Sequence, residues 1–174
     1  MKLLMYQIFL LGLVMFIPKH AMAIEVKISG ELLASPCILA IESGDQTVRF
    51  NAISTKDLYA SGEAGKKDFS LILKNCDLNV SKSVSIIFTG EKSTKQNGLL
   101  ALDAGSIASG VAIGLKYKNN ILPLGSSTGG IDLTSGENTL QLSAFVHGDP
   151  STIENKTIKA GRFSAVANFT LNYP

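Results

Sequence analysis

The sequence predicts an all-β sandwich, and three observations indicate this fold class. Short runs in which apolar and polar residues alternate recur along the chain, as they do in strands with one buried face. Clusters of Gly, Ser, Thr, Asn and Asp separate these runs. No segment carries a sustained apolar stripe at helical spacing. Many short strands joined by turns, without a long helix, are typical of a sandwich.

Residues 1–23 are expected to be a secretory signal peptide. Lys2 gives a basic start, a mainly apolar run extends from Leu3 to Ile17, and Ala21-Met22-Ala23 has the small-x-small form of a cleavage site. The alternative is a transmembrane anchor, but the run is shorter than the roughly 20 residues that span a bilayer. No second long apolar run follows. The mature protein should therefore begin at Ile24 and should not span a membrane.

The charge and the cysteine content restrict the class of the mature chain. Lys2 and Lys19 lie in the signal peptide, so Lys plus Arg falls from 16 to 14 and balances the 14 Asp and Glu residues. A net charge near zero gives no support to nucleic-acid binding. Cys37 and Cys76 are the only cysteines. An even count in an exported protein favours a disulfide between them over two free buried thiols.

The expected elements follow in order along the mature chain. Residues 24–33 form the first strand, and Ser35-Pro36 marks a bend after it. Further short strands are expected at 37–41, 47–50, 69–76, 83–89, 99–102, 111–117, 121–124 and 139–146, and several of them alternate apolar and polar residues. Asn119-Asn120 predicts a tight turn, and Pro123 predicts a sheet edge or a bulge. Turn-rich loops are expected at 54–67, 125–136 and 147–159.

The end of the chain shows the clearest strand pattern. Between Gly161 and Pro174, apolar or aromatic residues occupy every second position: Phe163, Ala165, Ala167, Phe169, Leu171 and Tyr173. The residues between them are polar, except Val166. The start of the mature chain shows a matching alternation at Ile24, Val26, Ile28, Gly30 and Leu32. Both patterns predict half-buried strands, and a terminal strand needs neighbours from elsewhere.

No motif for catalysis or for cofactor binding is present. His147 is the one histidine of the mature chain, and it is interpreted as a solvated loop residue. No Gly-x-Ser-x-Gly elbow accompanies it, and the phosphate-binding and dinucleotide-binding glycine motifs are absent. The two cysteines have no histidine near them, so a zinc site is not indicated. The sequence therefore predicts neither an enzyme nor a cofactor.

These residues together resemble the subunits of chaperone–usher pili, in particular the minor pilins of type 1 and P pili. Gly30 falls where the N-terminal extension of those subunits carries a glycine, and Cys37 and Cys76 fall where their disulfide lies. Gly161 is fourteenth from the C-terminus and Tyr173 is penultimate, both of which are hallmarks of the family. The resemblance covers the whole mature chain.

The resemblance implies an immunoglobulin-like sandwich that lacks its last strand and is completed in trans by a donor strand. Residues 24–33 would be the donor extension, running into the first strand, and residues 34–174 the pilin domain. A periplasmic chaperone would lend a strand first, with its basic residues holding the carboxylate of Pro174. At the outer-membrane usher, the extension of another subunit would replace that strand. The expected product is an adhesive fimbria on the cell surface, built from this exported structural subunit.

The resemblance also assigns roles to residues. Donor-strand side chains would come from Ile24, Val26, Ile28, Gly30 and Leu32, with Gly30 passing where the groove is too narrow for a side chain. The acceptor groove and the chaperone-binding strand would be formed by Gly161, Phe163, Ala165, Ala167, Phe169, Leu171, Tyr173 and Pro174. The alternative function is a single-domain adhesin that binds a receptor through the loops 54–67 or 125–136. A secreted enzyme, the third possibility, lacks any candidate site.

Overall fold

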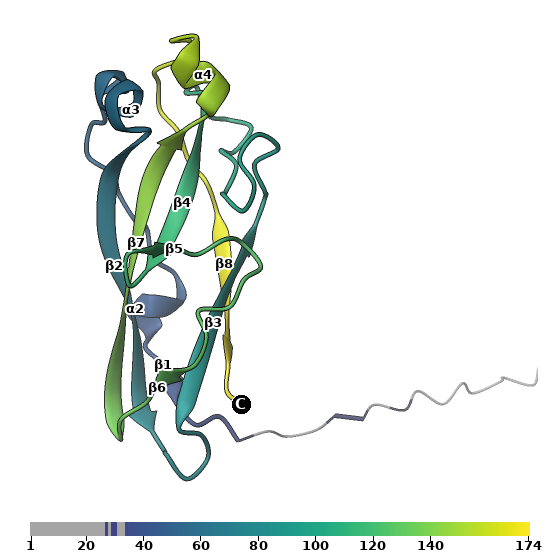
Figure 1. Ribbon diagram of the computed structural model, residues 1–174. Coiled ribbons are helices and arrows are strands. Elements are labelled where there is room, and N and C mark those ends of the chain that lie inside the picture. The colour runs from purple at the N-terminus through teal and green to yellow at the C-terminus, as the bar shows by residue number, and fades with distance from the viewer. Residues whose placement is uncertain (1–26, 28, 31–33) are drawn as a thin grey trace, which may run out of the picture. The chain divides into compact units, whose positions relative to one another are not determined.

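The structure is a computed structural model that describes residues 27, 29, 30 and 34–174 (Figure 1). The expected first strand, 24–33, lies outside the described residues except at Lys27, Ser29 and Gly30. The unit Ala34–Pro174 is therefore considered by itself. Its elements are β1 (Ile38–Leu39), α2 (Ile41–Gly44), α3 (Thr55–Ser61), β2 (Glu63–Cys76), β3 (Ser83–Gly90), β4 (Val111–Tyr117), β5 (Asn120–Ile121), β6 (Ile131–Asp132), β7 (Gly136–Gly148), α4 (Pro150–Glu154) and β8 (Ala167–Asn172).

Two antiparallel sheets form the sandwich. The larger has the strand order β1-β2-β7-β4-β5, and the smaller has the order β6-β3-β8. The long strands β2 and β7 pair through Phe69 and Leu142, whereas β8 pairs with β3 through Phe169 and Phe88. Figure 1 shows β8, in yellow, as the last strand of its sheet. The expected all-β sandwich is confirmed, and within the described chain β8 keeps one edge without a partner strand.

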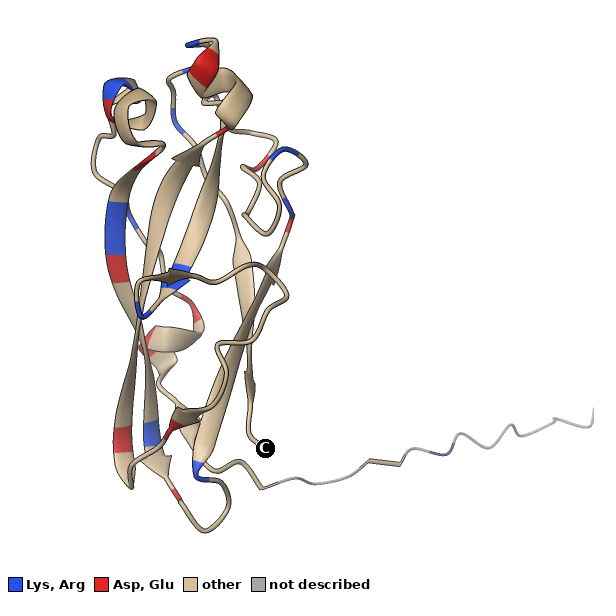
Figure 2. Cartoon of the chain, viewed as in Figure 1, with Lys and Arg blue, Asp and Glu red and all other residues tan. Residues whose placement is uncertain are grey.

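The core lies between the inward faces of the two sheets. In the expected strands 69–76, 83–89, 111–117 and 139–146, most of the apolar side chains at alternate positions are buried in this core: Leu71, Leu73, Val84, Ile86, Phe88, Ile113, Leu115, Leu140, Leu142, Ala144 and Val146. Charged side chains of both signs are dispersed along the strands and loops that the structure describes (Figure 2). The fold therefore buries one face of each sheet and mixes its surface charges.

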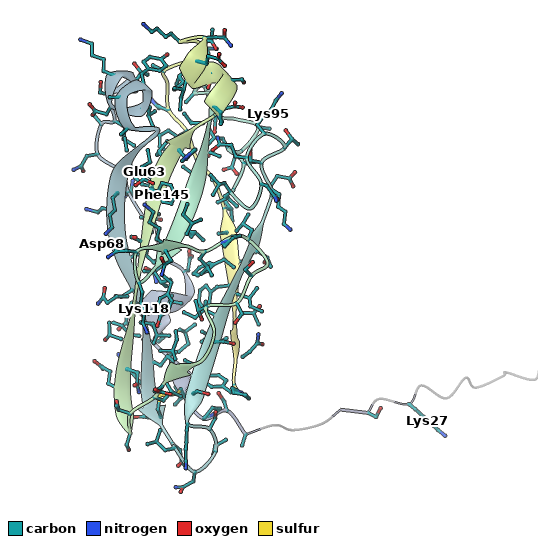
Figure 3. All side chains as sticks on the ribbon, viewed as in Figure 1. Lys27, Glu63, Asp68, Lys95, Lys118 and Phe145 are labelled. Carbon is teal, nitrogen blue, oxygen red and sulfur yellow. A yellow bond between two sulfur atoms is a disulfide. The ribbon has the colours of Figure 1, made fainter. Side chains whose placement is uncertain are left out.

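One buried aromatic residue lies on the face of β7 opposite to this core. Phe145 is 1% exposed, and its ring occupies the space that a side chain at Gly114 of β4 would need. The ammonium group of Lys116 lies 4.3 Å from the centroid of that ring and 2.7 Å from Oε1 of Glu63. Figure 3 labels Glu63 and Phe145 among the side chains of this sheet. The glycine makes room for the ring, and the lysine covers it.

Three short helices were not predicted. The expected loops 54–67 and 147–159 contain α3 and α4, and α2 follows β1. In α3, the Ser54 hydroxyl accepts a hydrogen bond from the Lys56 N–H (3.2 Å), and Gly62 ends the helix at a φ of 79°. Helices of one or two turns are too short to show an apolar stripe, so only their capping residues could have indicated them.

Asp149 caps α4 from the end of β7. Its Oδ1 accepts hydrogen bonds from the Ser151 hydroxyl (2.8 Å) and from the Ser151 N–H (2.9 Å). The hydrogen bond from the Ser151 hydroxyl makes the largest contribution to lowering the pKa of this carboxyl, and the bond from the Ser151 N–H lowers it further. Burial acts in the opposite direction, but the pKa remains below its ordinary value. The charged form of Asp149 is therefore favoured in the folded state.

We expect Asp149→Ala to lower the free energy of unfolding at neutral pH by about 1 kcal/mol, because a helix cap is lost. Asp149→Asn keeps an acceptor and should cost less. A depressed folded pKa stabilises the fold above the unfolded pKa, and this contribution is lost as the pH falls through the folded pKa. Urea unfolding followed from about pH 7 into acid should show wild type approaching the Asn variant. A pH-independent difference between the two would contradict this.

Candidate strand-acceptor groove

A groove of about 1040 Å³ lies between two segments that are far apart in the sequence. We call residues 43–53 the first rim and residues 161–169 the second rim, since these two segments line its sides. The floor is formed by apolar side chains of both sheets and of the segment before β4: Phe69, Leu71, Phe88, Leu100, Ile113, Leu115 and Ala144. The groove is therefore an opening into the core of the sandwich.

The second rim is fastened to a loop that does not line the groove. The N–H groups of Ile107 and Ala108 both donate to the Arg162 carbonyl (2.8 and 3.1 Å), and the Asp103 N–H donates to the Ser164 carbonyl (2.8 Å). Within the described part of the chain, Phe163 has no hydrogen bond to its backbone groups. The backbone of this rim thus alternates between bonded and free residues, as an edge strand does.

Gly161 has a structural reason for its place at the start of this rim. A Cβ added there would lie 2.6 Å from Cγ2 of Ile107 and 2.9 Å from the backbone nitrogen of Ala108. Both distances are too short for a side chain, so the rim can approach the loop this closely only at a glycine. The resemblance to pilus subunits marked Gly161 as a family hallmark, and the structure shows the close packing that requires a glycine at this position.

The side chains of the second rim and of β8 follow the predicted alternation. Those of Phe163, Ala165, Phe169, Leu171 and Tyr173 are half-buried and pack against the core, whereas Ala167 is exposed. Partial burial raises the pKa of the Tyr173 hydroxyl. The strand is shorter than predicted, because residues before Ala167 bond to a loop instead of to β3.

Aromatic rings connect β8 to the floor of the groove. The ring of Phe169 lies 6.0 Å from that of Phe88, which lies 6.4 Å from that of Phe69 in an edge-to-face arrangement. The end of the chain is itself fixed, because the Ser81 hydroxyl donates to an oxygen of the terminal carboxylate of Pro174 (3.2 Å). The floor therefore offers a continuous aromatic surface to whatever occupies the groove.

The first rim contains the predicted strand 47–50, which the structure does not form. Val48 and Phe50 are half-buried while Thr47 and Arg49 are exposed, so the side chains do alternate as in a strand. Within the described residues, the backbone from 45 to 53 makes no hydrogen bond to another backbone group. The sequence pattern is that of a strand, and what it lacks is a partner strand.

The remaining predicted site residues fall into two groups. Cys37 and Cys76 are buried and joined in a disulfide, as expected. Of the donor positions, Ile24, Val26, Ile28 and Leu32 lie outside the described residues, and Gly30 is exposed.

The interpretation of His147 as a solvated loop residue was wrong. His147 belongs to β7 and is half-buried, with Nδ1 lying 2.6 Å from Oε1 of Gln96. Among the described residues, no three His, Cys, Asp or Glu side chains gather in a way that could hold a metal ion.

Comparisons with known proteins identify the family. The sequence model of the family described as fimbrial protein matches residues 26–174. The Fimbria A protein of Serratia marcescens is 33% identical over 149 residues, which cover 86% of this chain and 83% of that protein. The Major MR/P fimbria protein of Proteus mirabilis strain HI4320 is 30% identical over 150 residues, covering 85% and 82%.

Solved structures agree with the sequence comparison. The crystal structure of the P pilus rod subunit PapA has a TM-score of 0.69 at 29% identity, covering 80% of this chain and all of that one. A chaperone–usher pilus structure that addresses rod uncoiling has a TM-score of 0.70 at 28% identity, covering 91% and 98%. No helix among the described residues is long and apolar enough to cross a membrane. The chain belongs to the fimbrial protein family and is a structural, non-enzymatic subunit of the chaperone–usher type.

Proposed function

We propose that the chain polymerises into a surface fimbria by donor-strand exchange, with the groove accepting the donor strand of a neighbouring subunit. The observation that carries this proposal is that, within the described chain, residues 45–53 of the first rim and Phe163 of the second rim have no backbone–backbone hydrogen bond beside an apolar floor. Backbone N–H and C=O groups next to an apolar surface are costly unless they are hydrogen-bonded. A strand inserted between the rims would satisfy both and would cover the floor.

The proposed donor is the segment 24–33 of a second copy of the chain. Burying the aliphatic side chains of Ile24, Val26, Ile28 and Leu32 on the floor would contribute roughly 1.5–3 kcal/mol each. Gly30 would cross the groove where a side chain does not fit. Strands within a sheet lie about 4.8 Å apart, so one donor would pair with the first rim on one side and with the second rim on the other. The segment 47–50 would then become the strand that its sequence predicts.

Before assembly, a periplasmic chaperone would occupy the groove in the same way. The exposed carboxylate of Pro174 would be held by basic residues of the chaperone, and the Ser81 hydroxyl would keep the end of β8 in position for that contact. An outer-membrane usher would then exchange the chaperone strand for the donor of the next subunit. The family resemblance and an apolar floor that needs cover throughout export support this sequence of partners.

The test of strand donation uses substitutions in the segment 24–33, which precedes the unit Ala34–Pro174. The purified wild-type chain is expected to form a ladder of multimers that survives SDS without heating, because each junction buries a complete strand. Ile28→Asp should abolish the ladder, since a carboxylate cannot enter the apolar floor unpaired. Ser29→Asp is the matched control, because its side chain would point to solvent, and it should polymerise normally. Equal ladders from the two variants would rule out this segment as the donor.

A further inference from the structure

The two rims of the groove touch each other at one aromatic contact. The ring centroids of Phe50, on the first rim, and Phe163, on the second rim, lie 5.9 Å apart with an interplanar angle of 44°. Both side chains are half-buried, and both residues line the groove. The contact therefore joins two segments across the space that a donor strand would occupy.

The two rims are held to the rest of the fold in different ways. The second rim is fixed by backbone hydrogen bonds from Ile107 and Ala108 to Arg162. The first rim is attached near its start, where the Gln46 side chain donates to the Ser70 carbonyl (3.0 Å). Its end leads into α3, and within the described residues no backbone–backbone bond holds the part between them. The middle of the first rim is therefore held by side-chain packing, with Phe50 and Ile53 lying against Gly65 of β2 and Phe50 against Phe163. It can move away from the fixed rim only when the ring contact opens.

The contact leaves no room for a side chain to pass. Carbon atoms in contact lie about 3.5–4.0 Å apart, so a carbon atom placed between two rings requires roughly 7–8 Å between them. The centroid separation of Phe50 and Phe163 is only 5.9 Å. The rings must therefore separate before a donor with side chains can move between the rims at this level.

We propose that Phe50 and Phe163 form a clasp that ties the two rims of the groove together and limits the rate at which a donor strand enters. This inference rests on the proposed function, because it requires that the groove accept a strand. A strand that enters only the open form is taken up at a rate that stops rising at high donor concentration, where clasp opening becomes limiting. From the strength of an aromatic pair, removing one ring should raise that limiting rate roughly 2- to 10-fold.

The experiment measures uptake of a fluorescent synthetic peptide of residues 24–33 by stopped-flow anisotropy. The full chain carries Ile28→Asp, so that it does not donate its own strand, and is kept dilute against excess peptide. In this background the rate should level off with peptide concentration, and Phe50→Ala and Phe163→Ala should each raise the plateau. The double variant should gain no more than either single variant, because the two residues share one contact. Ile158→Ala, a half-buried position that packs on the core outside the groove, is the control and should leave the plateau unchanged.

Three outcomes would overturn the clasp. One is a rate that rises linearly with peptide concentration and is the same for wild type and Phe50→Ala. Another is a plateau that Ile158→Ala raises as much as Phe50→Ala does, since that would indicate general loosening of the fold. If none of the proteins takes up the peptide, the groove does not accept this strand, and the clasp proposal fails together with the proposed function. If Phe50→Ala does not fold, Phe50→Leu keeps most of the volume without the ring, and its plateau should still rise above that of wild type.

Discussion

Repeating residues 24–33 after Pro174 through a short flexible linker is expected to raise the melting temperature of the chain by roughly 10–20 °C. Four aliphatic side chains entering the groove would contribute about 6–12 kcal/mol before the cost of ordering the strand, of which we expect about 5 kcal/mol to remain. For a domain of this size, each kcal/mol shifts the midpoint by about 2–4 °C. The linker can be short, because an antiparallel neighbour of β8 begins beside the end of that strand.

The matched control carries the same linker and the same added length, with Asp replacing the second copies of Ile24 and Ile28. It should melt with the parent, because two carboxylates cannot be buried unpaired. A parent that is already as stable as the fusion would mean that the sandwich is complete without a partner, and strand exchange would have to be abandoned. Two unstable proteins would mean that this groove rejects the donor of its own chain and takes a strand of different sequence.

The sequence indicated the groove through features that repeat at short range. The alternation from Phe163 to Tyr173 identified the core-facing side of the last strand, because side-chain direction in a strand depends on parity alone. The alternation at Val48 and Phe50 was equally informative, although the structure forms no strand there. Parity shows which side chains face inward, whereas a strand also requires a partner for its backbone, and that partner is absent from the described fold.

Other features depend on contacts that no local pattern contains. Phe145 is buried on the outward face of its sheet because Gly114 lies on the neighbouring strand. The contact between Phe50 and Phe163 joins residues from the two ends of the domain. The short helices depend on caps such as Ser54 and Asp149, which also occur in loops. Sequence reasoning located the residues around the groove, but the closing of one rim on the other required the coordinates.

Replacing both cysteines by alanine is expected to lower the free energy of unfolding by about 4 kcal/mol, in a range of about 2–5 kcal/mol. The disulfide between Cys37 and Cys76 closes a loop with a sequence separation of 39 residues, which restricts the unfolded chain. Urea denaturation of the oxidised wild type and of the double variant measures the difference. Wild type with its disulfide reduced is the matched control, because it keeps both side chains and should lose a similar amount.

Loss of the disulfide should also weaken donor-strand binding in the groove, because the loop that the disulfide closes contains the whole first rim. Between the disulfide and α2, the start of this loop is held by the two-residue strand β1, which pairs with β2 at Ile38–Lys74 and Leu39–Leu73. Without the disulfide, β1 can separate from β2, and the first rim then loses its position beside the floor. The fused donor strand should therefore stabilise the double variant by less than it stabilises wild type. An equal gain in both backgrounds would show that the rim is positioned by α3 and the floor alone.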